Sequence, residues 1–325
     1  MSLEHKRLVW AYLQKLNTQR PETHADVLRD HLAEDITWHG PHPLNDLVGV
    51  DAVYEGYWGP LQEALERPQV TPYILMSGRF DGKDWVAATG DIVGRMGGSY
   101  LGIPASGQTV SVRYGEFMAL EGGKVRTSYL LLDLPSWMQQ AGLSPFPYLL
   151  ADDAPVPGPL AGDGLLLSEQ DEGASAASVT LVERMIGGLG AYDQRDKSSM
   201  GQAQFWTPEM LWYGPHGIGT TYGLAGFEQH HQLPFLKAFP DRKGGNHKAR
   251  FGDGLYAAST GWPSIRATHR GEYLGVLPTG RGVEMRVMDF WRRDRNRLHE
   301  NWVFIDMPHL FLQMGVDVLG RARGS

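Results

Sequence analysis

Two acidic residues lie among apolar neighbours on segments with the alternation of β-strands. Along residues 110–118 and 283–291, this alternation puts Glu116 and Asp289 on the apolar faces. Burying a carboxylate is costly unless the group is paired or stays protonated. A carboxyl group kept in such a place suits general acid/base chemistry, because a raised pKa lets it exchange protons near neutral pH. The alternatives are an acid satisfied by a neighbouring donor, or a strand that bends until the acid faces solvent.

A histidine on the preceding segment is a candidate partner for Asp289. Alternation over residues 265–273 puts His269 on the apolar side with Ile265 and Tyr273. Because imidazole titrates near neutral pH, His269 and Asp289 facing one cavity would form an acid/base pair. The alternative is a histidine satisfied within the core.

Aromatic residues and histidines are the candidates for contacting a ligand in such a cavity. Several follow a short strand in each half of the chain, and others share strands with the acids. The predicted substrate-binding residues are His39, Tyr114, Tyr213, His216, Trp291 and Trp302. His39 and His42 lack a third ligand at a suitable spacing, so no metal site is predicted. His231 is expected on the solvated surface of a helix.

These candidates recur because the chain is an internal duplication. Trp38-His39-Gly40-Pro41-His42 matches Trp212-Tyr213-Gly214-Pro215-His216, which begins 174 positions later. Further on, Tyr100-Leu101-Gly102-Ile103 matches Tyr273-Leu274-Gly275-Val276 at an offset of 173, and the same offset relates Glu116 to Asp289. Met96 is the equivalent of His269. Only the second copy therefore carries a histidine and an acid together.

The repeat predicts two domains, residues 1–143 and 174–325, joined by a connector, residues 144–173, rich in proline, glycine and acid. Each domain begins with helical patterns. Strands follow over 35–39, 70–80, 83–96, 107–120 and 123–132 in the first domain, and over 246–252, 254–270, 281–293 and 297–305 in the second. Helices that precede a run of antiparallel strands predict an α+β fold. Asp133 and Asp306, two residues before a proline, are expected to cap the last helix of each domain.

Composition limits the classes of function. The 325 residues carry a net charge of −7 with no basic block, which argues against a nucleic-acid partner. The absence of cysteine excludes disulfides, zinc–thiolate sites and thiol nucleophiles, and fits a cytoplasmic protein. Neither a signal-peptide core nor a long uncharged apolar run is present, so no membrane partner is expected.

Motifs in the second half carry a family resemblance. They are Gly271-Glu-Tyr-Leu-Gly-Val-Leu-Pro-Thr-Gly-Arg-Gly-Val, Asp289-Phe-Trp-Arg-Arg and His299-Glu-Asn-Trp-Val-Phe-Ile-Asp-Met. In these motifs the chain resembles the SnoaL-like polyketide cyclases, and the first half, with Ser99-Tyr-Leu-Gly-Ile-Pro, is similar but more diverged. The resemblance implies two tandem cone-shaped α+β barrels of the ketosteroid-isomerase-like and nuclear-transport-factor-like type. In each, a curved antiparallel sheet wraps N-terminal helices around a pocket.

The resemblance also implies a chemistry. In those cyclases an acidic residue drives an intramolecular aldol reaction without metal or cofactor, and the family's acid and neighbouring histidine fall on Asp289 and His269. The predicted function is cofactor-free cyclisation or isomerisation of a small hydrophobic carbonyl compound, with Glu116 as the acid of the first domain. The two domains are expected to form an intramolecular pseudo-dimer, and homodimerisation is left open. The alternatives are a non-catalytic binding protein, or a hydrolase or dehydratase on the same fold.

Overall fold

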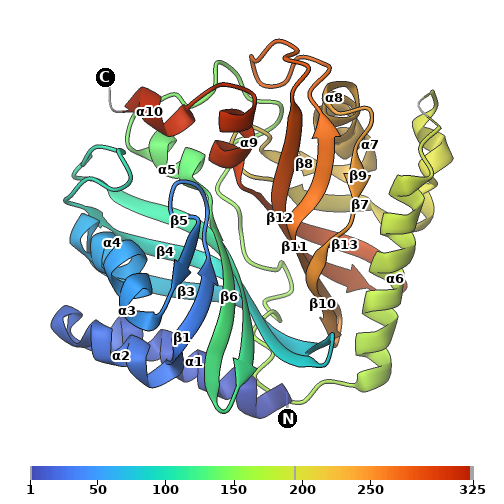
Figure 1. Ribbon diagram of the computed structural model, residues 1–325. Helices are drawn as coiled ribbons and strands as arrows, with labels where there is room; N and C mark the ends of the chain where they lie inside the picture. The colour runs from blue at the N-terminus through green and yellow to red at the C-terminus, as the bar shows by residue number, and fades with distance from the viewer. Residues whose placement is uncertain (1, 194, 323–325) are drawn as a thin grey trace.

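The computed structural model describes residues 2–193 and 195–322, which form two helix-and-sheet domains side by side (Figure 1). The first domain contains α1 (Ser2–Thr18), η1 (Pro21–Thr23), α2 (His24–His31), β1 (Leu32–His39), β2 (Asp46–Val48), α3 (Val50–Val53), η2 (Tyr54–Trp58), α4 (Gly59–Ala64), β3 (Leu65–Phe80), β4 (Lys83–Met96), β5 (Thr109–Glu121), β6 (Lys124–Leu132) and α5 (Leu134–Gln140). The second contains α6 (Glu172–Gly190), η3 (Lys197–Met200), η4 (Gln202–Gln204), β7 (Trp206–Tyr213), β8 (Thr220–Tyr222), α7 (Gly223–Phe227), η5 (Glu228–Gln232), α8 (Leu233–Ala238), β9 (Lys243–Gly244), β10 (His247–Asp253), β11 (Tyr256–Thr268), β12 (Gly282–Asp294), β13 (Arg297–Ile305), α9 (Met307–Gln313) and α10 (Val318–Ala322). The division at residues 143 and 174 stays a prediction.

The two sheets have the same topology. Their strand orders are β2-β1-β6-β5-β4-β3 and β8-β7-β13-β12-β11-β10, with β9 paired to β11. The predicted α+β fold with helices before the sheet is confirmed, but the sheets are open and not closed barrels. Nor are they purely antiparallel, because β1 runs parallel to β6 and β7 runs parallel to β13. In each domain the first long strand lies next to the last strand of the sheet, and the two run in the same direction.

Tight hairpins hold the long strands in register. Asp81-Gly82 joins β3 to β4, and Gly122-Gly123 joins β5 to β6, with all four residues at positive φ. Two-residue loops with positive φ match the twist of paired strands, and glycine and aspartate adopt that conformation at low cost. The register set by these turns decides which side chains share a row across each sheet.

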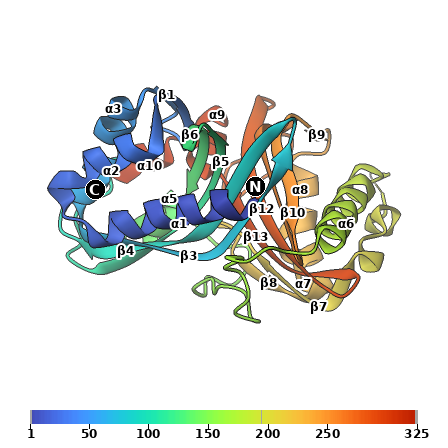
Figure 2. The same cartoon turned by 90° about the horizontal axis from the view of Figure 1, so that it is seen from below.

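One face of each sheet is covered by helices. In α1, Val9, Leu13 and Leu16 are buried at helical spacing, and the helix lies along β3 and β4 (Figure 2). In α6, the buried residues include Val182 and Met185, and the helix packs on β10 and β11. A stripe at spacings of three and four residues is what an amphipathic helix needs to cover a sheet.

The other faces of the two sheets pack against each other. The ring of Phe117 on β5 lies 5.3 Å from Phe290 on β12 and 6.0 Å from Phe251 on β10. Where β3 approaches β10, a Cβ added at Gly78 would lie only 2.6 Å from Cβ of Phe251, so glycine permits the contact. The interface is therefore built from side chains that alternate with those facing the helices.

Reciprocal hydrogen bonds join the domains at equivalent positions. Arg113 donates to the carbonyl of Gly214 at 2.7 Å, and Arg286 donates to the carbonyl of Gly40 at 3.3 Å. Since Arg113 and Arg286 are repeat equivalents, as are Gly40 and Gly214, the contacts obey an approximate two-fold symmetry within one chain.

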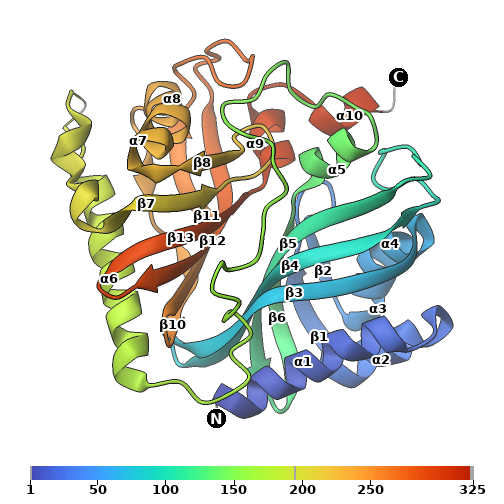
Figure 3. The same cartoon turned by 180° about the vertical axis from the view of Figure 1, so that it is seen from behind.

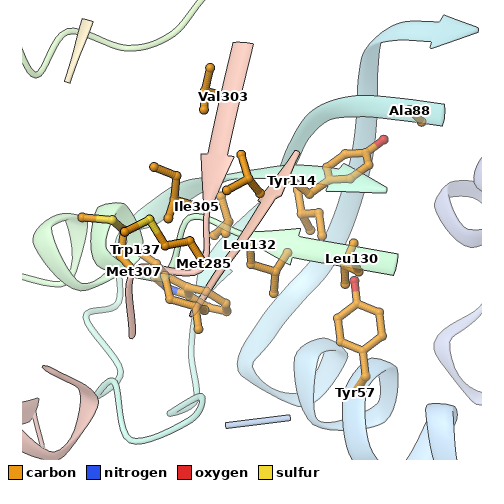
Figure 4. Packing of buried hydrophobic residues seen from close by; sticks show 14 of the residues in the cluster. Tyr57, Ala88, Tyr114, Leu130, Leu132, Trp137, Met285, Val303, Ile305 and Met307 are labelled. Atoms are coloured by element: carbon orange, nitrogen blue, oxygen red, sulfur yellow. The ribbon is translucent and has the colours of Figure 1, made fainter. Parts of the chain in front are cut away.

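The capping aspartates take part in the same symmetry. Asp133 and Asp306 accept from the first turns of α5 and α9, which confirms the predicted caps. Asp133 also accepts the backbone N–H of His216 at 3.0 Å, and Asp306 accepts that of His42 at 2.9 Å. Each cap thereby holds a loop of the other domain. Trp137 of α5 and Met307 of α9 belong to the apolar cluster of Figure 4.

The connector is bound to both sheets along its course between them (Figure 3). Leu165 pairs with Leu75 on the edge strand β3, and Pro157 accepts a hydrogen bond from the indole of Trp302 at 2.9 Å. Asp163 forms an ion pair with Arg292 at 2.8 Å. The connector between the two domains is therefore held by contacts on either side.

A buried ion pair crosses from α1 to β10. The side chain of Lys6 is fully buried and lies 2.8 Å from Asp253, which also accepts the N–H of Ser77 at 2.9 Å. The ammonium group donates a second bond to the carbonyl of Ser168 at 2.9 Å. One charged contact thus ties the first helix, the connector and the second sheet together.

We expect Asp253→Asn to lower the free energy of unfolding by about 3–5 kcal/mol, because it leaves the buried ammonium group of Lys6 without its countercharge. Denaturant unfolding of the full chain measures the change. The matched control is Asp35→Asn, which breaks an exposed pair with Arg126 and should cost less than about 1 kcal/mol. Equal small losses in both variants would contradict the role given to Lys6.

Candidate active site

The second domain encloses a large cavity between its sheet and helices. The cavity volume is about 700 Å³. Its apolar wall is formed by residues of α6, β7, α7, α8 and the sheet, among them Met185, Trp206, Trp212, Phe227, Phe235, Ile265, Val287 and Val303. A space of this size and lining is suited to an apolar small molecule.

Asp289 lies in the wall of this cavity, on β12. Its neighbours in the same row of the sheet are Ser259 on β11 and Val303 on β13. Asn301 places its amide Nδ2 3.5 Å from the Asp289 carboxylate and donates more closely to the carbonyl of Phe290, at 3.1 Å. The carboxyl group therefore has one amide donor, at the long end of hydrogen-bond distances, and otherwise faces the cavity.

Burial raises the pKa of Asp289 to about 7, while the Asn301 amide and the charge of Arg250 act in the opposite direction. Removing a carboxylate from water disfavours its charged form, and the neighbouring cation offsets only part of this cost. A carboxyl group with this pKa is present as acid and as base in similar amounts near neutral pH. It can therefore both remove and return a proton.

Three basic side chains line the cavity with Asp289: Arg242, Lys243 and Arg250. Arg250 on β10 donates from Nε to the hydroxyl of Ser259 at 3.3 Å and from Nη2 to His247 at 2.7 Å. Burial and the charge of Arg250 lower the pKa of His247 to about 4, so this imidazole is neutral at physiological pH. Arg250 is thus the cation of this cluster.

The first domain keeps its acid without a comparable cavity. Glu116 on β5 accepts a hydrogen bond from the hydroxyl of Ser128 at 2.7 Å, and burial raises its pKa to about 7. The space beside it has a volume of only about 20 Å³. That is room for about one water molecule.

Bulky side chains fill the first domain's pocket. Tyr12, Tyr57 and Tyr114 line the small space, and Figure 4 shows Tyr57 and Tyr114 with Leu130. At the repeat-equivalent positions the second domain has Met185, His231 and Val287, all of which line the large cavity. The difference in volume therefore follows from substitutions on a shared framework.

The structure does not form the predicted pair of His269 and Asp289. The residue opposite Asp289 on β11 is Ser259, and His269 comes ten positions later, beyond the end of that strand. His269 is fully buried beside the ring of Phe239 and lies 3.1 Å from the hydroxyl of Thr279. Strand alternation predicts which face of the sheet His269 is on, but not how far along the strand it lies from Asp289. His269 lies in the core, which was the alternative considered for it from the sequence.

The predicted substrate-binding residues divide between the two faces of the sheets. Trp291 lines the large cavity and Tyr114 lines the small space. The other four residues lie elsewhere: His39, Tyr213, His216 and Trp302. His39, Tyr213 and Trp302 lie on the opposite face of the sheets and not in the cavity beside Asp289. His216 lines a separate cavity of about 320 Å³ between the domains, with Arg113 and Asp153.

These four residues make contacts at the domain interface. His39 stacks on Tyr129 at 4.5 Å, and the ring of Tyr213 packs on Trp302 at 5.3 Å. His216 contacts Asp153 of the connector at 2.8 Å. The cavity is lined instead by their neighbours in sequence, Trp212 among them, because adjacent strand residues point to opposite faces.

Sequence reasoning missed several polar residues of the cavity. Arg250, His247 and Asn301 lie on strands that were predicted, but none of them was singled out as a candidate site residue, although Asn301 lies in the motif that begins at His299. His231 was expected on the surface and is instead stacked on Trp212 at 4.1 Å, where burial lowers its pKa to about 3. A signal was present for Asn301, which is the repeat equivalent of Ser128, the donor to Glu116.

Two further findings concern the described part of the chain. Within residues 2–193 and 195–322, no group of three or more histidine and acidic side chains is arranged to hold a metal ion. Among the same residues, no helix has both the length and the apolar character needed to cross a membrane.

Comparison with known families assigns both halves of the chain. The model of the SnoaL-like polyketide cyclases matches residues 191–314, and that of the SnoaL-like domain matches residues 9–127. The chain therefore belongs to the SnoaL-like family and carries two tandem copies of its domain. No curated protein sequence matches the chain significantly.

Solved structures of single domains are similar to parts of the chain. A candidate SnoaL-like polyketide cyclase from Jannaschia sp. CCS1 is 20% identical over 42% of this chain and 91% of its own, with a TM-score of 0.37. AclR from Streptomyces galilaeus, a candidate hydroxylase, is 26% identical over 43% and 86%, with a TM-score of 0.35. IdmH from Streptomyces antibioticus, a candidate polyketide cyclase, is 24% identical over 41% and 98%, with a TM-score of 0.34.

We expect Glu116→Gln to raise the melting temperature at about pH 8 but not at about pH 4. The folded pKa of Glu116, about 7, exceeds its ordinary value of 4.5, so ionisation between these values costs the folded state stability. Glutamine carries no charge and keeps an acceptor for Ser128. Thermal unfolding at the two pH values measures the effect, with exposed Glu121→Gln as control. An equal change at both pH values would contradict the assigned titration.

Proposed function

We propose that the second domain is a cofactor-independent acid/base catalyst that cyclises or isomerises a hydrophobic carbonyl compound, with Asp289 as its proton shuttle. The observation that carries the proposal is the position of this one carboxyl group, desolvated to a pKa of about 7 and facing a cavity of about 700 Å³. Membership of the SnoaL-like family supports the same class of reaction.

Both routes require two proton transfers, and cyclisation also forms one new carbon–carbon bond. The carboxylate of Asp289 takes a proton from a carbon beside a carbonyl group, which leaves an enolate and a protonated Asp289. In cyclisation the enolate carbon attacks a second carbonyl carbon of the same molecule, and the resulting alkoxide takes the proton back. In isomerisation the proton returns to a different carbon. Neither route consumes a co-reactant, and one group with a pKa near neutrality serves both steps.

In this proposal the first domain has no catalytic turnover of its own. Glu116 has the required pKa, but about 20 Å³ beside it leaves no space for a carbonyl compound. Its contribution is structural, because its sheet covers the outer face of the catalytic domain through Phe117 and Arg113.

We expect Asp289→Asn to reduce carbon proton exchange by about 10²–10⁴-fold, the usual contribution of general acid/base catalysis. The assay follows deuterium incorporation into 2-tetralone, a compact apolar ketone, in heavy water by NMR. Glu116→Gln is the matched variant and should leave the rate within about twofold. Equal losses in the two variants, or exchange by wild type no faster than in buffer, would contradict the proposal; binding of 2-tetralone without exchange would identify a binding protein.

The exchange rate should also rise with pH through about 7 and then level off. The reason is that the first step uses the carboxylate form of Asp289, which dominates only above its pKa. Initial rates with 2-tetralone between about pH 5 and pH 9 provide the profile, after subtraction of the rate in buffer. A profile that is already flat above about pH 5 would show that the base titrates below pH 5, which contradicts the pKa of about 7 assigned to Asp289.

A further inference from the structure

The row of residues that contains Asp289 also contains a largely buried cation, Arg250, whose side chain is 11% exposed. Arg250 on β10 pairs with Ser259 on β11, and Ser259 pairs with Asp289 on β12. Side chains in one such row point to the same face of a sheet. Adjacent strands are about 4.8 Å apart, so the backbones of Arg250 and Asp289 are separated by roughly 10 Å across the floor of the cavity.

The first domain has no counterpart to this cation. There the row that contains Glu116 continues through Ala88 on β4 to Leu75 on β3, and both neighbours are apolar and buried. Leu75 thus occupies the place that Arg250 has in the second domain. The second domain, which has the open cavity, therefore has a cation at this position, and the first domain, whose pocket is filled, has an apolar residue there.

The hydrogen bonds of Arg250 leave its charge without a close partner. Its guanidinium donates to the hydroxyl of Ser259 and the ring of His247, which are both neutral acceptors. Within residues 2–193 and 195–322, Nη1 of Arg250 donates no hydrogen bond. The carboxylate of Glu183 lies 4.0 Å from Nη1, and the Glu183 side chain is about half exposed. An exposed, distant carboxylate compensates little of a buried charge. Asp289, the other acid near Arg250, is uncharged in about half of the molecules at neutral pH.

An apolar ligand that fills the cavity would displace the water that solvates this cation. A buried charge left unpaired is strongly unfavourable, so the bound ligand itself must supply an anion to Arg250. An enolate formed only during the reaction would leave the charge unpaired in the initial complex. A carboxylate is present throughout and matches the planar fork of a guanidinium.

We propose that the ligand of the second domain carries a carboxylate group, which Arg250 binds from Nη1. This inference rests on the proposed function for the identity of the pocket, and it names the class of substrate as an apolar carboxylic acid with a carbonyl group. The carboxylate lies toward β10, and the reacting carbon lies beside Asp289 on β12. Arg250 is then a specificity-determining residue, which anchors the substrate at a distance from the chemistry.

The test compares two probes of the same shape, one anionic and one neutral, in which an amide NH₂ group replaces one carboxylate oxygen. Naphthalene-2-carboxylate and its neutral amide, naphthalene-2-carboxamide, are titrated into the full chain by calorimetry at about pH 6, where Asp289 is mostly protonated and the probe acid is ionised. Wild type should bind the carboxylate at least about tenfold more tightly than the amide, the range of a charge-assisted hydrogen bond. Equal binding, or preference for the amide, overturns the proposal.

Variants then locate the preference. Arg250→Gln should lose the preference for the carboxylate while binding of the amide stays within about threefold, which also shows that the cavity is intact. Arg250→Lys keeps the charge and should retain part of the preference. The control is Arg266→Gln, which removes an exposed arginine of the same domain and should change neither affinity. A carboxylate preference that survives in Arg250→Gln overturns the assignment to Arg250.

Binding and turnover fail independently in this design. Loss of carboxylate preference with intact 2-tetralone exchange would reject the substrate class and leave the proposed catalysis in place. Carboxylate preference without any exchange would support the anion site and reject the catalysis. The two proposals therefore have separate readouts.

Discussion

Burial of each sheet on both faces is the constraint on which the rest of this molecule depends. The face toward the helices can hold a cavity and an acid, while the opposite face is committed to the other domain through Phe117, Phe290 and their neighbours. Because side chains alternate, the parity of a residue along its strand decides which of these two roles it has. Arg113 and Arg286 each reach a backbone carbonyl of the other domain, so the two sheets are fixed as a pair and neither can expose its outer face to solvent.

The duplication shows one framework in two states. Both copies keep a desolvated carboxyl group at the same register position, with a hydrogen-bond donor, Ser128 or Asn301, on the neighbouring strand. In the first copy three tyrosines fill the space beside the acid, and in the second smaller or polar residues leave it open. A raised pKa is thus common to both domains, and room for a ligand distinguishes them. Desolvation raises the pKa of each carboxyl group toward neutrality, but only an accessible cavity brings a substrate to that group.

Much of this was accessible from the sequence, because the repeat and the period-two patterns are local properties. The α+β class, the approximate ranges of the long strands and the inward acids Glu116 and Asp289 followed from them. Three features did not follow. The closing of the first pocket depends on side-chain volume contributed by α1 and η2, which no strand pattern reports. The pairing of His269 with Asp289 failed because alternation fixes a face and not a distance along the strand. His39, Tyr213 and Trp302 were misplaced because the second sheet that buries their face lies far away in the sequence.

The proposed catalysis depends on Asp289 as a desolvated acid that titrates near neutral pH in an open cavity. A carbon-13 NMR titration of aspartate and glutamate carboxyl groups tests this most directly, with Asp289→Asn and Glu116→Gln used to assign the two resonances. We expect a midpoint of about 7 for both groups, and a shift of the Asp289 resonance alone when naphthalene-2-carboxamide is added. An Asp289 midpoint near 4, the ordinary value for aspartate, would contradict the proposed role of Asp289, because such a carboxyl group would be solvated and could not exchange protons near neutrality.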